Sequence, residues 1–295
     1  MLNHEINKAF RSRLASGGAV LLPGAANALA ARIIADLGFE AIYLSGAGLT
    51  NTYLGLPDLG FISLPEIAQH TASIRDATDL PIVVDADTGF GNALNVRHTI
   101  RTLERAGASA VQIEDQVSPK RCGHFSGKDV VDLSEARSRI KAAVDARQDR
   151  NLMIVARTDA RATLGLSAAI ERAQAFIEDG ADITFVEAPE SLEEIREIPA
   201  RLKGTPQLVN LVVGGRTPIP PFAELDETGF ALVLYANVAL QGAIHGMQAA
   251  LGRLMTDGRL DEGGPVASFK ERQRLVQKPL FDELEERYST DEAGA

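Results

Sequence analysis

Short apolar segments recur along the chain, and polar or glycine-containing stretches separate them. Each segment is a few residues of nearly continuous apolar character, which is typical of strands buried on both faces of a parallel sheet. These segments predict strands at 19–22, 41–44, 81–84, 110–113, 152–155, 183–186, 207–209 and 231–234.

Helical patterns lie between these strands, and three of them end in the same way. The predicted helices at 26–37, 93–106 and 167–179 are each followed by a glycine, a short turn and the next strand. A glycine directly after a helix is a common C-cap. The alternation predicts a parallel (β/α)8 TIM barrel. The main alternative, an open doubly wound sheet, would place a Gly-x-Gly-x-x-Gly turn after the first strand, and residues 22–27 contain none.

The end of the chain continues beyond the elements that a barrel needs. We expect the catalytic barrel to occupy residues 1–257, and residues 258–295 to form a linker and a helical tail. A helix beyond a complete barrel must bury its apolar face somewhere, and a neighbouring subunit is one candidate.

Composition narrows the class of protein. The chain has 295 residues, of which 45% are hydrophobic, so it can bury a large core. Its net charge of −10, with acidic and basic residues interspersed, argues against a nucleic-acid-binding surface, which needs a clustered basic face. No apolar run approaches the roughly 18–20 residues that cross a bilayer, and residues 1–5 lack the pattern of a signal peptide. With a single cysteine, the chain is expected to be a soluble cytoplasmic protein whose partners are small molecules.

Polar residues follow the predicted strands, at the end of a barrel where active sites lie. They are Tyr43 near the end of the second strand with Ser45 and Gly46 after it, Asp85 and Asp87 after the third, Glu114 and Asp115 after the fourth, Arg157 and Asp159 after the fifth, Glu187 after the sixth and Asn210 after the seventh. Asp85 and Asp87 alternate, so both would point the same way from an ideal strand. So many neighbouring carboxylates would be costly without a cation. Asp85, Asp87 and Glu114 therefore predict an all-oxygen site for Mg²⁺, with Mn²⁺ as an alternative.

The only cysteine, Cys122, lies in the segment Lys-Arg-Cys-Gly-His at 120–124. A lone cysteine is either a small packed residue or a reactive thiol. The cations of Lys120 and Arg121 and the imidazole of His124 favour the reactive interpretation. Arg157 could bind a carboxylate or stabilise an enolate oxygen, and it could also form a structural ion pair with Glu187 or Glu114.

The segment 120–124 resembles the signature of the isocitrate lyase and phosphoenolpyruvate mutase superfamily. Segments 43–46, 85–91, 113–116, 156–160 and 186–189 support the resemblance, which runs in order over residues 10–255. The chain is most similar to the short 2-methylisocitrate lyase and 2,3-dimethylmalate lyase members, because it lacks the insertions of long isocitrate lyases.

The resemblance implies a magnesium-dependent barrel whose last helix is exchanged between paired subunits of a homotetramer. It implies that Asp85, Asp87 and Glu114 organise the metal, with Asp87 as the direct ligand and Asp58 ordering the site. The residues that we expect to bind the substrate are Ser45, Gly46, Ala47, Arg157, Glu187, Asn210, Val212 and Val213.

The chemistry implied is that of a carbon–carbon lyase. A 2-hydroxy acid, such as a 2-alkylmalate or a compound similar to 2-methylisocitrate, would give a 2-oxo acid such as pyruvate and a carboxylic acid through an enediolate. Cys122 would protonate the enediolate from a loop that closes over the substrate. Lys120, His124 and Arg157 would stabilise its charge, and Tyr43 is the candidate base.

The sequence departs from the family pattern after the seventh strand. Val212 and Val213 stand where methylisocitrate lyases typically have threonine and glutamate, so we expect a substrate whose distal end is smaller or more alkyl. Oxaloacetate hydrolysis at the same site remains an alternative. Phosphorus–carbon chemistry is disfavoured because mutase-type members usually lack the cysteine. A non-catalytic barrel is disfavoured because the whole acidic set is present.

Overall fold

The structure, a computed structural model, describes residues 1–120 and 129–289. The chain divides into two compact units, Met1–Leu240 and Gln241–Ala295. From the sequence we predict that the barrel unit ends at residue 257. The first compact unit ends at Leu240, so most of the helix α11 (Val238–Asp257) falls in the second unit.

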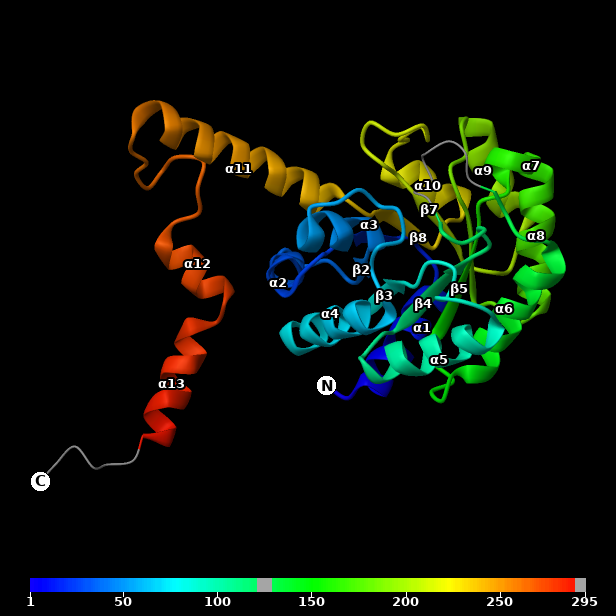
Figure 1. Ribbon diagram of the computed structural model, residues 1–295, viewed down its shortest axis with the longest axis horizontal. Coiled ribbons are helices and arrows are strands. Elements are labelled where there is room, and N and C mark those ends of the chain that lie inside the picture. Colours follow the sequence, from blue (N-terminus) through cyan, green and yellow to red (C-terminus); the bar gives the residue numbers. More distant parts are fainter. Residues whose placement is uncertain (121–128, 290–295) are drawn as a thin grey trace, which may run out of the picture. The chain divides into compact units, whose positions relative to one another are not determined.

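Eight parallel strands form the centre of the first unit, and helices surround them (Figure 1). The sheet order β1-β8-β7-β6-β5-β4-β3-β2 runs almost around a circle, and a bridge between Gly24 and Tyr43 joins its two ends. The backbone N–H of Ala25 donates to the carbonyl oxygen of Tyr43 at 2.8 Å across this junction. The predicted TIM barrel is therefore confirmed. The strands are β1 (Val20–Pro23), β2 (Ile42–Leu44), β3 (Ile82–Asp85), β4 (Ala110–Glu114), β5 (Met153–Thr158), β6 (Ile183–Val186), β7 (Gln207–Asn210) and β8 (Leu232–Tyr235).

Strand β5 extends beyond its predicted end. The prediction stopped at residue 155, but the strand continues to Thr158, and Arg157 pairs in register with Glu114 of β4. Arg157 therefore lies inside a strand and not directly after one. The apolar pattern missed this because a charged side chain interrupts it, whereas the backbone continues to pair with both neighbouring strands.

The helices of the first unit follow the strands around the barrel. The three helices predicted from glycine-terminated patterns correspond to α2, α5 and α8, with ends that differ by one or two residues. The helices are α1 (Asn3–Ala15), α2 (Ala28–Asp36), α3 (Gly46–Leu49), the π-helix η1 (Thr50–Leu54), α4 (Leu64–Ala77), α5 (Ala93–Arg105), α6 (Leu133–Ala146), α7 (Arg161–Leu164), α8 (Leu166–Glu178), α9 (Leu192–Arg201) and α10 (Phe222–Thr228).

The interior of the barrel is packed with side chains, as in other barrels of this kind. Phe10 and Leu14 of α1 belong to the same buried cluster as Leu22, Val155 and Phe185 from three different strands. Helix α1 therefore packs against the interior side chains and helps to fill the barrel. Because these side chains fill the interior, the barrel centre itself offers no room for a ligand within the described residues.

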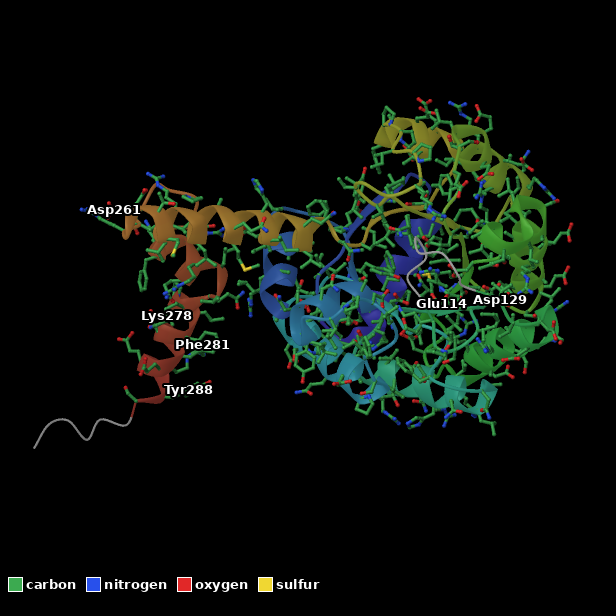
Figure 2. All side chains as sticks on the ribbon, turned by 45° about the horizontal axis from the view of Figure 1, so that its top comes forward. Glu114, Asp129, Asp261, Lys278, Phe281 and Tyr288 are labelled. Carbon is green, nitrogen blue, oxygen red and sulfur yellow. The ribbon has the colours of Figure 1, made fainter. Side chains whose placement is uncertain are left out.

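The second unit is helical and exposes many apolar side chains. Helix α11 (Val238–Asp257) is followed by α12 (Phe269–Leu275) and α13 (Lys278–Tyr288), which are separated by Gln277 in a left-handed conformation (φ 58°). Phe281 and Tyr288 project from α13 with 57% and 72% of their surface exposed (Figure 2). No helix within residues 1–120 and 129–289 is both long enough and apolar enough to cross a membrane.

We predict that Gly24→Ala strongly destabilises the barrel where its sheet closes. A methyl group on Gly24 would lie 1.8 Å from the backbone carbonyl oxygen of Ala236, and a backbone atom cannot move away cheaply. We expect the free energy of unfolding in urea to fall by about 3 kcal/mol or more. Gly17→Ala is the control, because a methyl group there meets nothing within 4 Å and only the φ of +84° is unfavourable, at about 1–2 kcal/mol. An equal or smaller loss in Gly24→Ala would contradict the prediction.

Candidate active site

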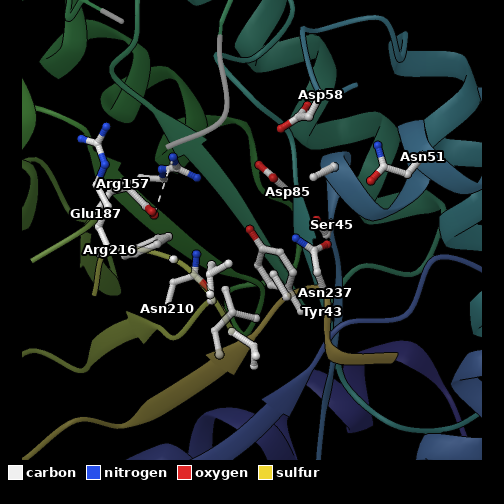
Figure 3. A pocket seen from close by; sticks show the side chains of 18 of the residues that line it. Tyr43, Ser45, Asn51, Asp58, Asp85, Arg157, Glu187, Asn210, Arg216 and Asn237 are labelled. Atoms are coloured by element: carbon white, nitrogen blue, oxygen red, sulfur yellow. Dashed lines mark ion pairs between the residues drawn. The ribbon is translucent and has the colours of Figure 1, made fainter. Parts of the chain in front are cut away.

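A cavity of about 620 Å³ opens at the carboxyl ends of the strands (Figure 3). Most of the site residues predicted from the sequence contribute to its wall, although they come from six different strands or the segments that follow them. These residues are Tyr43, Ser45, Ala47, Asp58, Asp85, Lys120, Arg157, Glu187, Asn210, Val212 and Val213. Figure 3 shows Asp58 and Asp85 on one side of the cavity, and Arg157 and Glu187 across from them.

The remaining predicted residues fall into two groups. Gly46, Asp87 and Glu114 do not line the cavity but contact residues that do. Cys122 and His124 lie outside the described residues, so their predicted roles stay predictions.

Asp85 is held at the end of β3 by two hydrogen bonds to its Oδ1. The backbone N–H of Asp87 donates at 3.2 Å, and the side-chain amide of Gln112 donates at 3.0 Å. The same amide group of Gln112 accepts a hydrogen bond from the hydroxyl of Tyr43 at 2.9 Å. Gln112 therefore couples the carboxylate of Asp85 to the phenol of Tyr43 through one buried amide.

The geometry of Asp87 differs from that of an ideal strand. Strand β3 ends at Asp85, and Asp87 adopts a left-handed conformation with φ 48°. The alternation argument for the two carboxylates therefore does not apply. Both still face one place, because a methyl group on Gly46 would lie 3.2 Å from Asp87 Oδ1 and 3.6 Å from Asp85 Oδ2.

The ammonium group of Lys120 is buried between two carboxylates. Its Nζ lies 2.6 Å from Asp58 Oδ1 and 3.0 Å from Asp87 Oδ1, and only 6% of the side chain is exposed. Burial acts to lower the pKa of Lys120, but the charges of Asp87 and Glu114 outweigh it and raise the pKa above its ordinary value. Lys120 is therefore a fixed positive charge beside the acidic residues.

Arg157 supplies a second buried positive charge from β5. Its guanidinium forms a two-point ion pair with Asp159 at 2.9 and 3.0 Å, and it lies 3.4 Å from Glu114 and 3.6 Å from Glu187 (Figure 3). It also stacks over the ring of Phe185 at 5.2 Å. The two-point pair restricts the orientation of the guanidinium. Because Arg157 also lines the cavity, a structural ion pair and a role towards the substrate are compatible.

A line of hydrogen bonds outside the cavity holds Asp159 in place. The backbone N–H of Asp159 donates to Asp115 Oδ1 at 2.9 Å, and the hydroxyl of Thr158 donates to Asp115 Oδ2 at 2.6 Å. Arg172 of α8 lies 3.0 Å from the same Oδ2. The position of Arg157 therefore depends on a surrounding helix as well as on its own strand.

Burial raises the pKa values of Asp87, Glu114 and Tyr43. Desolvation raises the pKa of Asp87 from 3.8 to about 7, although the charge of Lys120 opposes this shift. Desolvation also raises the pKa of Glu114, with Arg157 opposing it. The pKa of the Tyr43 phenol is raised well above 10 by burial and then by the charge of Asp85, so this phenol holds its proton at neutral pH.

The residues present fit a divalent cation that is held by few direct ligands. Within the described ranges, no three His, Cys, Asp or Glu side chains are arranged to hold a metal ion together. However, Gly46 leaves space in front of one oxygen of Asp85 and one of Asp87, which a larger residue would fill. The buried Oε1 of Glu114 also has no hydrogen-bond partner among the described residues. Mg²⁺ usually keeps several water molecules and takes one or two carboxylates, which matches this arrangement.

The structure adds wall residues that the sequence argument missed. Asn51 precedes the loop of Asp58, and Asn237 follows β8. Asn237 could have been found by the rule that located the others, because it lies two residues beyond the last strand. Gln112 could not, because a glutamine inside a strand gives no sign of which groups its amide will meet.

The family model for phosphoenolpyruvate phosphomutase matches residues 10–255. A 2,3-dimethylmalate lyase from Eubacterium barkeri is 40% identical over 284 residues, covering 95% of this chain and 97% of the relative. A 2-methylisocitrate lyase from Aeropyrum pernix is 46% identical over 239 residues, covering 81% of this chain and 76% of the relative. The chain therefore belongs to the phosphoenolpyruvate mutase and isocitrate lyase superfamily. Within this superfamily it is a carbon–carbon lyase, as the sequence predicted.

Solved structures agree with this assignment. A crystal structure of 2,3-dimethylmalate lyase superposes with a TM-score of 0.91 at 32% identity, covering 100% of this chain and 98% of that chain. An oxaloacetate acetylhydrolase with 3,3-difluorooxalacetate has a TM-score of 0.87 at 32% identity, covering 96% of each chain. A phosphonopyruvate hydrolase solved with oxalate and Mg²⁺ has a TM-score of 0.87 at 30% identity, covering 98% of this chain and 99% of that chain.

We predict that Asp87→Asn stabilises the protein at pH 8 when a chelator is present. An acid whose pKa is about 7 folded and near 3.8 unfolded binds more protons in the folded state between these values, so its contribution to stability falls as the pH rises. Asparagine does not ionise, so the variant avoids the loss of folding stability that ionisation of Asp87 causes, which is worth up to about 4 kcal/mol at pH 8. Urea unfolding at pH 5 and pH 8 should therefore show a larger gain at pH 8.

Asp79→Asn is the matched control for this experiment, because Asp79 is 66% exposed and pairs only with the N-terminal amine among the contacts described. Its substitution should change stability little at either pH. A loss of stability in Asp87→Asn at pH 8, or an equal change at both pH values, would contradict the prediction.

Proposed function

We propose that this lyase cleaves a 2-alkylmalate, with 2,3-dimethylmalate as the best candidate, to a 2-oxo acid such as pyruvate and a carboxylic acid. The observation that carries the proposal is the pair of buried cations, Lys120 and Arg157, that face carboxylates in one cavity with an apolar outer wall. Similarity to the 2,3-dimethylmalate lyase over nearly the whole of both chains supports this choice of substrate.

We propose that Asp85, Asp87 and Glu114 hold a Mg²⁺ ion, with Asp87 as the direct ligand and Asp58 ordering the site through Lys120. When bound, the ion lowers the pKa of a substrate hydroxyl group and neutralises its carboxylate. The hydrogen bonds from Gln112 and the backbone of Asp87 keep one oxygen of Asp85 fixed, so its other oxygen faces the space beside Gly46.

The positive residues suit the charge that develops during cleavage. When the bond between C2 and C3 breaks, electrons collect on the carboxylate fragment as an enediolate, which needs nearby positive charge. Arg157 lines the cavity and is held rigidly by Asp159, so it can meet that charge without rearranging. Lys120 lies across the cavity from it and stabilises the same fragment.

Proton transfer requires one group that accepts a proton and one that donates it. Tyr43 remains the candidate base, but its raised pKa means that the phenol can act as one only if its own proton first moves to another group. The neutral phenol is well suited to orient the substrate. Cys122, supported by His124, remains the predicted donor to the enediolate.

Other residues are proposed to bind the substrate directly. Ser45, Gly46 and Ala47 present the turn into α3, and the hydroxyl of Ser45 accepts a hydrogen bond from the backbone of Gly48, which fixes that turn. The Oδ1 of Asn210 is buried without a hydrogen-bond partner among the described residues, so its amide can contact the substrate. Glu187 lines the same side of the cavity and is held near Arg157.

The outer wall of the cavity favours an alkyl substrate end. Val212 and Val213 line the cavity after β7, and Pro57 and Leu234 add further apolar surface to its lining. A carboxylate against these side chains would lose its hydrogen bonds to water, at roughly 1–3 kcal/mol for each unsatisfied group. We propose that the distal end of the substrate is a small alkyl group and not the carboxylate arm of 2-methylisocitrate.

Hydrolysis of oxaloacetate is a second candidate, favoured by the structural similarity to an oxaloacetate acetylhydrolase. Oxaloacetate is also a small diacid that the same cations can bind. Phosphorus–carbon chemistry remains the weaker alternative.

We propose that the chain forms a homotetramer in which the tail helices are exchanged between paired subunits. The exposed apolar residues of the second unit support this, because an isolated helical tail would leave them in water. Ile244, Met247 and Leu251 on α11 recur at the spacing of one helix face, and each is at least 42% exposed. The cytoplasmic location also stays a prediction.

We predict Mg²⁺-dependent release of pyruvate from 2,3-dimethylmalate. The assay measures pyruvate and glyoxylate from citramalate, dimethylmalate, methylisocitrate and isocitrate, and oxalate and pyruvate from oxaloacetate, with Mg²⁺ and with a chelator. Arg157→Met is the inactive control, because it removes a buried charge from the cavity. No Mg²⁺-dependent product from any hydroxy acid would sink the proposed function, and rapid oxaloacetate turnover alone would favour the second candidate.

We predict that the double substitution Val212→Thr with Val213→Glu moves the preference towards 2-methylisocitrate. The threonine hydroxyl can donate a hydrogen bond to the additional carboxylate, and the glutamate can hold a nearby cation that pairs with that carboxylate. Both polar side chains accommodate an alkyl end poorly. We expect the ratio of kcat/KM for methylisocitrate over dimethylmalate to rise at least about ten-fold. Val212→Ile with Val213→Ile, which keeps the wall apolar, should leave the ratio nearly unchanged. A parent protein that already prefers methylisocitrate would refute the assignment of this wall.

A further inference from the structure

Lys120 contacts the carboxylate that is proposed to bind the metal directly. Its Nζ lies 3.0 Å from Oδ1 of Asp87, and the same Oδ1 faces the space beside Gly46. We infer that Lys120 competes with the divalent cation for Asp87 and thereby sets the affinity of the site for that cation. This inference rests on the proposed function, because it requires the chain to bind a divalent cation at all.

The three groups converge on one small space. A methyl group on Gly46 would lie 3.2 Å from Asp87 Oδ1, 3.6 Å from Asp85 Oδ2 and 3.7 Å from Lys120 Nζ. A cation that binds either carboxylate oxygen from that space is therefore within a few ångströms of an ammonium group. Because all of these groups are buried, water screens the repulsion between the two positive charges only weakly.

Lys120 has a second carboxylate partner, Asp58, which allows Asp87 to leave the ammonium group and bind a metal ion. Asp58 Oδ1 lies 2.6 Å from Nζ, closer than the oxygen of Asp87. The ammonium can therefore keep one full ion pair when Asp87 turns to a metal. Without Asp58, displacement from Asp87 would leave a buried charge unpaired, which is strongly unfavourable.

The charge of Lys120 also reduces the net negative charge of the acidic residues around it. Lys120 is held beside Asp87, and the other carboxylates near it are Asp58, Asp85 and Glu114. A fixed ammonium neutralises part of this cluster at all times, so the cluster attracts a divalent cation less strongly than its number of carboxylates suggests. Lys120 thus moderates metal affinity while it remains at the cavity wall, where it can also face the substrate.

The test is calorimetric titration of the full-length protein with MgCl₂ at constant pH and ionic strength, repeated with MnCl₂ and electron paramagnetic resonance. Lys120→Met keeps the length of the side chain and removes its charge, and we expect it to bind Mg²⁺ about ten-fold more tightly or better than the parent. Lys120→Arg keeps the charge and should stay within about three-fold of the parent. Lys141→Met is the matched control, because Lys141 is 59% exposed and pairs with Asp179 at 3.4 Å.

Asp58→Asn provides an independent arm if Lys120→Met fails to fold. With Asp58 neutral, Asp87 becomes the main partner of the ammonium, so Mg²⁺ should bind several-fold more weakly. Unchanged or weaker Mg²⁺ binding by folded Lys120→Met overturns the inference, as does unchanged or tighter binding by Asp58→Asn. A parent protein that binds Mg²⁺ normally while the variants fail these expectations leaves the proposed function standing. A parent and variants that bind no divalent cation overturn both.

Discussion

The structure of this site depends on the need to neutralise charges that the barrel buries at the carboxyl ends of its strands. Asp58, Asp87 and Glu114 would each be unfavourable in the interior if they were alone. Lys120 and Arg157 stand among them, so each carboxylate lies near a cation. The raised pKa values of Asp87 and Glu114 show that this compensation is incomplete. A site that still favours additional positive charge is suited to bind a divalent cation and to stabilise an anionic fragment.

The barrel makes this concentration of charge possible because it distributes the residues over rigid neighbouring strands. Glu114 and Arg157 are register partners on β4 and β5, so their separation is set by backbone hydrogen bonds. Asp159 and Asp115 then hold the guanidinium from behind. The bridge at Gly24 joins β1 to β2, and β1 pairs with β8 on its other side, so residues after β8 and after β2 line the same cavity. The sheet therefore fixes the positions of Glu114 and Arg157, whereas Asp58, Asp87 and Lys120 lie in the segments that follow the strands.

Family membership and the wall residues together narrow the reaction. The relatives show that the chain is a carbon–carbon lyase, but the same scaffold also supports hydrolases. The acidic cluster and its cations suit any of these reactions, so they do not distinguish the substrates. The proposed choice of substrate rests on Val212 and Val213, because an apolar wall leaves a carboxylate without partners.

The sequence by itself determined the architecture and most of the cavity wall. Continuous apolar runs and helix-terminal glycines predicted all eight strands, and the rule that active sites lie beyond strand ends located Tyr43, Asp85, Arg157 and Asn210. These signals are local in the chain, so the sequence carries them directly. Only the tertiary structure decided which partners the charges take: Lys120 with Asp58 and Asp87, Arg157 with Asp159, and Gln112 between Tyr43 and Asp85. Except for Arg157 and Asp159, which are two residues apart, these groups come from different strands and loops, and neither periodicity nor composition records the distances between them.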